Sequence, residues 1–283
     1  MINISNLLWR SKKVCLFFFQ SNTIYNVHSP FVYKLLKECL ENQKNYYAYE
    51  KIESLRKKLK RSDKAINKSD FGAGAVNTGL QKTQSIKYLA STASSNFQKG
   101  SFLFKLVKYL EPQSILELGS CIGIGSAYMA SARKKARFIS VEACPETYKL
   151  AKNNCQQLGL GHLDFHCSTF SDFFEKKSIE HNSLDLVYMD GHHQYQPSLD
   201  YFEQIYPLLN KDKAVVVMDD IYWSKGMNQA WKKLKEDPRV HSSIDLFQLG
   251  LLILNTDIKS KQHYKIIRHK YKPWLNGFFS RKN

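Results

Sequence analysis

The segment from residue 115 to residue 126 constrains the fold more than any other part of this chain. It reads Ile-Leu-Glu-Leu-Gly-Ser-Cys-Ile-Gly-Ile-Gly-Ser, a short apolar run that leads into three glycines. The apolar run predicts a buried strand, and the glycines followed by small residues predict a loop that opens a helix. Glycines let the backbone approach a ligand where a side chain would collide. The segment therefore predicts a strand, a ligand-binding loop and a helix in succession.

The spacing of the glycines and two acidic residues indicates which ligand the loop accepts. The pattern is Gly-x-x-x-Gly-x-Gly and not the Gly-x-Gly-x-x-Gly of dinucleotide sites. Glu117 lies at the loop entrance, where it would repel a pyrophosphate and attract the ammonium of a methionine moiety. Glu142 ends the next apolar run, where it can accept hydrogen bonds from both hydroxyls of a ribose. The structural alternative is two solvent-exposed glutamates beside an ordinary turn.

Apolar runs and helical patterns alternate through the middle of the chain. Because only Gly250 separates the last two runs, they are too close for a crossover helix and should pair antiparallel. The rhythm predicts an α/β fold, a Rossmann-like, doubly wound, mostly parallel sheet of seven strands whose last strand is antiparallel. The apolar runs are 114–118, 137–141, 163–167, 184–189, 214–218, 244–249 and 251–255.

Three regions follow from this alternation. Residues 1–84 are predicted to be a helical and irregular extension or cap, in which Ser29-Pro30 starts a helix. Residues 85–257 form the α/β domain, and residues 258–283 form a basic tail. The stretch from Asp70 to Gly74 imitates the glycine loop but lacks a preceding apolar strand, so we interpret it as a loop of the extension, placed over the active site.

With these motifs, residues 94–255 resemble the class I S-adenosylmethionine-dependent methyltransferases. The most similar subgroup is the catechol O-methyltransferase-like enzymes, whose first motif also reads Leu-Glu-Leu-Gly with a later glycine. The resemblance implies S-adenosylmethionine as the cofactor, with Glu117 and Gly119 at its methionine end and Glu142 at its ribose. It also implies further cofactor-binding positions, of which Ser168 or Thr169 would contact adenine. The predicted cofactor set is Glu117, Gly119, Ser120, Gly123, Gly125, Ser126, Glu142, Ser168, Thr169 and Asp190.

A narrower resemblance covers nearly the whole chain. The stretches 28–31 (His-Ser-Pro-Phe), 70–74 (Asp-Phe-Gly-Ala-Gly) and 219–224 (Asp-Asp-Ile-Tyr-Trp-Ser) are similar to an uncharacterised bacterial group of class I methyltransferases. This similarity supports the fold and the cofactor but names no acceptor.

Three aspartates follow two predicted strands. Asp190 ends one strand, and Asp219 and Asp220 end the next, so all three should meet at the carboxyl edge of the sheet. Converging carboxylates repel one another unless a cation or protons intervene, and Mg²⁺ or Ca²⁺ prefers oxygen ligands. The three residues fall on the metal positions of catechol-type enzymes, although Asp220 replaces an amide there. The structural alternative is that Asp190 caps a strand end by bonding a nearby backbone amide.

Two histidines follow Asp190 where catechol-type enzymes carry a catalytic lysine. Histidine can accept a proton near neutral pH, so His192 and His193 are candidate general bases. We favour His193, because a related Asp-Gly-x-His-x-Tyr pattern of other metal-dependent methyltransferases places its histidine there. Exposed turn residues are the alternative. Tyr222 and Trp223 are candidates for the wall of the substrate pocket, or for helix capping and core packing.

The formal net charge of +17 is concentrated at the two ends of the chain. Residues 1–70 hold 14 Lys/Arg and 6 Asp/Glu, and residues 256–283 hold 8 and 1, whereas the middle is nearly neutral. Basic flanks can recruit RNA. A lysine-rich proteome explains them equally, because they contain no Arg-aromatic or glycine-arginine pattern.

The remaining composition bears on location. The apolar run 14–19 is too short for a signal peptide or a membrane span, and it belongs to a helix that packs on the protein body or lies on a membrane surface. Six cysteines without metal or disulfide spacing are typical of free thiols, so we expect a cytoplasmic protein. A homodimer is a further expectation that no motif specifies.

The sequence therefore predicts a methyltransferase that modifies an oxygen of a small molecule. An RNA (tRNA) methyltransferase and a non-catalytic protein that binds the cofactor are the alternatives.

Overall fold

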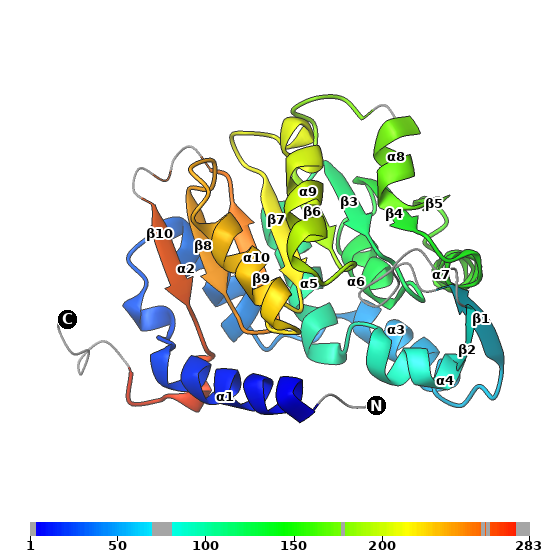
Figure 1. Ribbon diagram of the computed structural model, residues 1–283, viewed down its shortest axis with the longest axis horizontal. Coiled ribbons are helices and arrows are strands. Elements are labelled where there is room, and N and C mark those ends of the chain that lie inside the picture. Colours follow the sequence, from blue (N-terminus) through cyan, green and yellow to red (C-terminus); the bar gives the residue numbers. More distant parts are fainter. Residues whose placement is uncertain (1–3, 70–80, 177–178, 256–257, 259–260, 276–283) are drawn as a thin grey trace. The chain divides into compact units, whose positions relative to one another are not determined.

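The computed structural model describes residues 4–69, 81–176, 179–255, 258 and 261–275 (Figure 1). The chain forms two compact units. One combines Met1–Asn42 with His193–Asn283 and is called the terminal unit below; the other, Gln43–His192, is the central unit. The division into 1–84, 85–257 and 258–283 stays a prediction.

Four parallel strands organise the central unit. They are β3 (Ser114–Leu118), β4 (Arg137–Glu142), β5 (Asp164–Cys167) and β6 (Leu186–Met189), in the order β6-β3-β4-β5. All four residues of β6 and the last four of β3 are buried, as expected of parallel strands covered on both faces. The helices that connect or precede these strands are α5 (Phe97–Leu110), α6 (Ile124–Ala132), α7 (Pro145–Gln157) and α8 (Phe170–Lys176). The predicted succession of parallel strands and helices is confirmed here.

The beginning of the central unit contains a hairpin that the sequence did not predict. Helix α3 (Tyr47–Leu59) leads into β1 (Ala65–Ser69), which pairs antiparallel with β2 (Gln81–Ser85), and α4 (Ile86–Tyr88) follows. Both strands are mostly polar, so they give no apolar signal. The stretch Asp70–Gly74 lies outside the described residues.

Four strands also organise the terminal unit. They are β7 (Val215–Asp219), β8 (Ser242–Asp245), β9 (Leu249–Ile253) and β10 (Gln262–Lys265), in the order β10-β8-β9-β7. Strand β9 runs antiparallel to both β7 and β8, which confirms the predicted antiparallel pair, whereas β10 runs parallel to β8. The helices are α1 (Ile4–Gln20), α2 (Pro30–Leu36), α9 (Tyr195–Ile205) and α10 (Lys225–Lys235). The prediction of an α/β fold with mostly parallel strands is confirmed.

Short helical turns complete both units. Among the described residues, three are 3₁₀ turns, at Ile24–Asn26, Tyr206–Leu208 and His269–Tyr271, and two are π-helical turns, at Lys37–Glu41 and Leu89–Ala93. Helix α2 begins as predicted, because the Ser29 hydroxyl accepts a hydrogen bond from the Val32 amide and Pro30 occupies the first turn. Among the described helices, none has both the length and the apolar character to cross a bilayer.

The C-terminal flank is built into the terminal unit. Besides the pairing of β10, the Lys272 ammonium donates hydrogen bonds to the carbonyls of Phe19 and Ser21, at 3.2 and 2.8 Å. The Thr23 hydroxyl donates to the Leu275 carbonyl at 2.6 Å. Residues 261–275 are therefore packed structure within the terminal unit.

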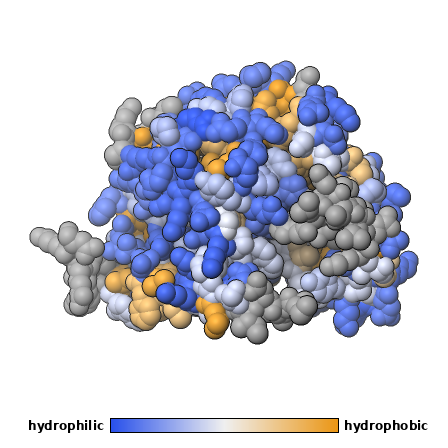
Figure 2. Space-filling model, in the orientation of Figure 1, coloured by the Kyte–Doolittle hydropathy of each residue, from blue (hydrophilic) through white to orange (hydrophobic). Residues whose placement is uncertain are grey.

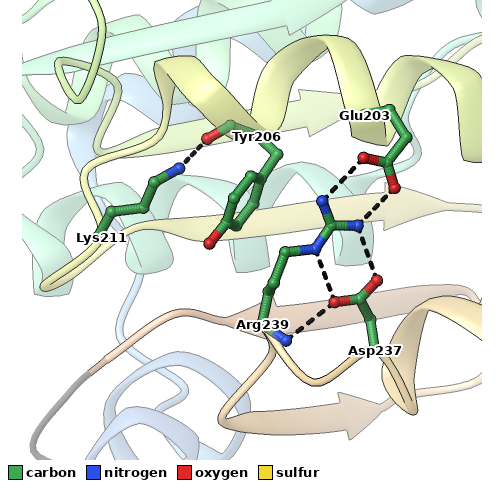
Figure 3. Close-up of polar contacts among 5 residues, drawn as sticks. All are labelled: Glu203, Tyr206, Lys211, Asp237 and Arg239. Atoms are coloured by element: carbon green, nitrogen blue, oxygen red, sulfur yellow. Dashed lines mark hydrogen bonds and ion pairs between the residues drawn. The ribbon is translucent and has the colours of Figure 1, made fainter.

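A cluster around Arg239 ties α9 to the segment after α10 (Figure 3). The guanidinium donates to Glu203 and to Asp237, each at 2.8 Å, and lies 4.4 Å from the Tyr206 ring centroid. Hydrogen bonds from Arg239 hold the pKa of both carboxyls below their usual range. Lys211 donates to the Tyr206 carbonyl in the same cluster.

Candidate functional site

All ten predicted cofactor residues lie in the central unit, at or just beyond the carboxyl ends of its parallel strands. Leu118 pairs with Val141 on one side and with Met189 on the other, so β3, β4 and β6 end at the same level. Cys167 of β5 pairs with Glu142. In open parallel sheets this edge is where ligands bind.

The glycine loop is shaped by close backbone contacts. Gly119 has a φ of +99°, and a Cβ atom there would lie 2.1 Å from the Asp190 carbonyl oxygen. Gly123 has a φ of +78°, and its Cβ atom would lie 2.9 Å from the Ala151 carbonyl oxygen. Two of the three glycines are therefore required by the backbone conformation and by the neighbouring chain. At Gly125 a Cβ atom would lie 3.1 Å from the Ser95 hydroxyl and 3.5 Å from the Glu117 carboxylate, so this glycine lies directly beside both side chains.

Glu117 is buried beneath the loop. One carboxylate oxygen, Oε2, accepts hydrogen bonds from the hydroxyls of Ser126 and Ser140, at 2.5 and 2.6 Å. Burial raises the pKa of the carboxyl to about 7, although the two hydroxyls act in the opposite direction. Near neutral pH this carboxyl can therefore be neutral or ionised, and an approaching cation favours the ionised form. The sequence identified Glu117 and Ser126 but missed Ser140, whose signal is a small polar residue in a buried strand.

Glu142 joins the glycine loop to the next helix. Its Oε2 accepts a hydrogen bond from the Cys121 amide at 2.8 Å, and its Oε1 accepts one from the Cys144 amide at 3.0 Å. Cys121 has a φ of +50°, so the loop turns sharply where it meets this carboxylate. A carboxylate has room for about four acceptor contacts, and hydroxyl groups are among the donors that it accepts. The two amides belong to the site, and no side-chain pattern could have revealed them.

The Ser120 hydroxyl is buried in the same loop. Among the described residues it has no hydrogen-bond partner. Buried polar groups are nearly always paired in a complete structure. An unpaired hydroxyl in the glycine loop therefore fits a site that a polar ligand completes.

Ser168 and Thr169 follow β5. The Thr169 hydroxyl accepts a hydrogen bond from the Asp172 amide at 3.1 Å and donates to the Asp172 carboxylate at 2.7 Å, which is the arrangement of a helix N-cap for α8. The Ser168 amide donates to the Glu142 carbonyl at 3.1 Å, so Ser168 lies beside the end of β4. Thr169 thus has a structural role, and a ligand role for either residue stays a prediction.

Asp190 and His192 follow β6 in the central unit. The Asp190 amide donates to the Leu118 carbonyl at 2.8 Å, and its carboxylate accepts a hydrogen bond from the Tyr188 hydroxyl at 3.2 Å. His192 has a φ of +47°, and its ring centroid lies 5.8 Å from that of Phe170. The turn after β6 is therefore fixed against both β3 and the start of α8.

His193, Asp219 and Asp220 belong to the terminal unit. The Ser224 hydroxyl, which caps α10, donates to the His193 carbonyl at 3.2 Å. The ring centroids of His193 and Trp223 are 6.5 Å apart. Asp219 is buried at the end of β7. Asp220 has a φ of +51°, and its amide donates to the Gln248 carbonyl at 2.7 Å. The structure thus joins His193 to the turn after β7 within this unit.

Tyr222 is a core residue of the terminal unit. Its ring stacks on Phe247, with centroids 4.7 Å apart, and its hydroxyl donates to the buried Asp245 carboxylate at 2.7 Å. Burial raises the pKa of Asp245 above its ordinary value. Of the two residues considered for the pocket wall, Tyr222 therefore has the packing role, whereas Trp223 is 42% exposed.

The metal prediction concerns Asp190, Asp219 and Asp220. Asp190 belongs to the central unit and Asp219 and Asp220 to the terminal unit. Within the part of the chain that the structure describes, no group of three or more His, Cys, Asp or Glu side chains is placed to hold a metal ion. We therefore assign no chemical step to a cation, and the three-aspartate site stays a prediction.

Comparisons with known proteins find methyltransferases that are similar to parts of this chain. A family model described as a methyltransferase domain matches residues 116–221. Among curated proteins, the human tRNA (uracil-5-)-methyltransferase homolog A is 42% identical over 55 residues, and this match covers 19% of the present chain and 9% of that protein.

Solved structures with the same fold cover most of the chain. An O-methyltransferase from Bacillus cereus in complex with SAH (S-adenosylhomocysteine) has a TM-score of 0.52 at 14% identity, covering 78% of this chain and 96% of that one. The SAH-bound methyltransferase PaMTH1 from Podospora anserina has a TM-score of 0.57 at 16% identity, covering 82% and 98%. These matches confirm the predicted Rossmann-like fold, and the methyltransferase domain model over residues 116–221 agrees with the predicted enzyme class.

Proposed function

We propose that this chain, an S-adenosylmethionine-dependent methyltransferase, transfers the methyl group to an oxygen atom of a small molecule. The observation that carries the proposal is the placement of Glu117, the loop Gly119–Gly125 and Glu142 along one carboxyl edge of β3 and β4. The O-methyltransferases among the structural neighbours support the choice of oxygen as the accepting atom.

Each residue of the proposed cofactor site has a separate task. The free Oε1 side of Glu117, beside Gly125, would face the methionine ammonium, and an approaching positive charge would favour its ionised form. The Ser120 hydroxyl would pair with the polar end of the same moiety. Glu142, already oriented by two backbone amides, would accept the ribose hydroxyls. Because these amides already hold the carboxylate in place, binding loses less side-chain entropy.

The chemical step needs alignment and removal of one proton. The cofactor supplies a methyl group that is activated by the sulfonium. When the acceptor oxygen forms its bond to the methyl carbon, the carbon–sulfur bond breaks and the acceptor proton must leave. We assign this proton to His193, with His192 as the alternative base. His193 is suited to this role because Ser224 holds its backbone and Trp223 lies beside its ring.

The direct test is methyl transfer to a panel of catechols, phenols and hydroxy acids, followed by mass spectrometry of both products. Formation of S-adenosylhomocysteine together with a methyl ether supports the proposal. His193→Gln should lower kcat by about 100-fold, since general bases contribute on that scale, while His192→Gln should lower it much less. Transfer to none of the hydroxyl acceptors, with binding of the cofactor intact, would contradict the choice of acceptor.

RNA is the alternative acceptor. The local similarity to a tRNA methyltransferase and the net charge of +17 favour it. Binding of bulk tRNA over a salt series separates the two candidates, because phosphate contacts weaken steeply with salt. Tight, salt-sensitive binding together with methylated tRNA would replace the small-molecule proposal.

Assistance by Mg²⁺ or Ca²⁺ is a separate proposal that rests on Asp190, Asp219 and Asp220. Activity after treatment with a chelator, and after restoration of each cation, tests it. Unchanged activity in the chelator would remove the cation from the mechanism and leave the methyl transfer untouched.

A further inference from the structure

The outer face of α1 is apolar. Leu8 is 67% exposed and Phe19 is 78% exposed, and both project from the same side of the helix because they lie about three turns apart. Leu7, Val14 and Leu16 are also exposed on this helix. Figure 2 shows hydrophobic side chains, in orange, gathered over α1 along the lower edge of the view. Solvent-facing helix positions are ordinarily polar, so this surface is suited to a partner.

The opposite face of α1 already packs on the terminal unit. Phe17 is buried, with its ring centroid 6.2 Å from that of Tyr222 and 5.3 Å from that of Phe247. The Arg10 guanidinium lies 4.6 Å from the centroid of the Trp223 ring. Since this inner face fixes the orientation of the helix, Leu8 and Phe19 are held outward.

Two exposed aromatic residues lie in the segment bonded to the end of α1. Lys272 donates hydrogen bonds to the Phe19 and Ser21 carbonyls, and on either side of it Tyr271 and Trp274 are 46% and 57% exposed. Tyrosine and tryptophan favour the interface between water and lipid, where one end of the side chain stays wet. We call Leu8, Leu16, Phe19, Tyr271 and Trp274 the α1 patch.

The two segments that form the α1 patch contain basic residues and no acidic residue. In the printed sequence no acidic residue precedes Glu38 and none follows Asp257. Lys12 and Lys270 are exposed within the two segments that form the patch. An apolar surface bordered by lysines is complementary to a partner that has an apolar interior and an anionic outer layer.

We propose that the α1 patch docks this protein on the surface of an anionic membrane, with Leu8, Phe19 and the aromatic residues in the headgroup region and the lysines over acidic lipids. This arrangement is typical of amphipathic helices that lie in the plane of the interface. A second copy of the chain fits less well, because a symmetric contact would bring two equally positive surfaces together. RNA would match the lysines but would leave the aliphatic side chains without an apolar partner.

Flotation of the full chain with vesicles tests the proposal and needs no cofactor, so its outcome is independent of the methyl transfer. Vesicles of phosphatidylcholine and phosphatidylglycerol in a two-to-one ratio should carry the protein, and vesicles of phosphatidylcholine alone should carry much less. The double variant Leu8→Ser/Phe19→Ser should reduce the partition coefficient at least about tenfold, given the apolar area withdrawn from water. Tyr88→Ser, which alters an aromatic residue that is 53% exposed outside the patch, is the matched control and should bind as the wild type does.

The charge component has its own pair of variants. Lys12→Gln/Lys270→Gln should weaken binding to the anionic vesicles by about fivefold per charge, whereas the exposed pair Lys57→Gln/Lys87→Gln should change it little. Equal binding to neutral vesicles, or absence of binding to both kinds, would overturn the proposal. So would a dimer in solution that Leu8→Ser/Phe19→Ser dissociates, since a second copy would then cover the patch. Unchanged thermal unfolding of these exposed-site variants shows that the fold is intact.

Discussion

Glu117 and Glu142 end neighbouring parallel strands, and their carboxylates have different surroundings. Glu117 is buried and bonded to two serine hydroxyls, whereas Glu142 is partly exposed and bonded to two backbone amides. The sequence predicted both residues because the strand-ending acid is visible in the pattern. It could not predict Ser140 or the amides of Cys121 and Cys144, since these come together only through the register of β3 and β4 and the turn at Cys121.

The raised pKa of Glu117 makes the stability of the protein depend on pH. Between the ordinary value of 4.5 and about 7, the folded protein retains a proton that the unfolded chain has lost. The free energy of unfolding should therefore fall as the pH rises through this window, by about 3 kcal/mol from this group. Urea denaturation at both ends of the window measures it. Glu117→Gln should flatten the dependence, and an identical slope in wild type and variant would contradict the assignment.

Gly119→Ala tests the close approach of the glycine loop to the end of β6. The new Cβ atom would lie 2.1 Å from the Asp190 carbonyl oxygen, in addition to the strain of a φ of +99°. Gly159→Ala is the matched control, because Gly159 has a φ of +73° and open space around it. We expect the control to cost about 1 kcal/mol and Gly119→Ala at least about 2 kcal/mol more in the free energy of unfolding. Equal costs in chemical denaturation would show that the contact with Asp190 is not tight.

At the scale of elements, buried strands were predictable and polar ones were not. Strands β3, β6 and β7 consist largely of apolar residues and β4 is half apolar, so their existence and approximate ends were visible in the sequence. Strand β10 reads Gln-His-Tyr-Lys, and it forms because its backbone pairs with β8 and not because its side chains are apolar. The hairpin β1–β2 escaped prediction for the same reason.

The Arg239 cluster stabilises the packing of α9 in the terminal unit. Arg239→Ala removes bonds to two carboxylates and the contact with the Tyr206 ring, so we expect a loss of about 1–2 kcal/mol in the free energy of unfolding. Lys149→Ala is the control, because Lys149 forms a single exposed pair with Glu146 at 3.8 Å, and it should cost less than about 0.5 kcal/mol. Thermal unfolding of both variants measures the two losses in stability. A loss for Arg239→Ala as small as that for Lys149→Ala would contradict a stabilising role.

At the scale of the whole molecule, the two ends of the chain fold into one unit and the proposed cofactor residues into the other. Sequence patterns predicted the order of elements but not this partition, because the contacts between residues 1–42 and 193–283 join segments far apart in the chain. The partition separates two proposed tasks. The central unit carries the proposed S-adenosylmethionine site, and the terminal unit carries His193 and the α1 patch.

Calorimetric titration of the full chain with S-adenosylmethionine tests the central claim most directly. We predict saturable binding of one molecule per chain and a decrease in affinity of at least about tenfold in Glu142→Ala, since that variant removes the proposed charged acceptor of two ribose hydroxyls. Glu146→Ala, which removes an acid from the first turn of α7, should bind as the wild type does. Absence of heat at high protein concentration, or equal affinity in Glu142→Ala and the wild type, would contradict the assignment of this edge of the sheet as the cofactor site.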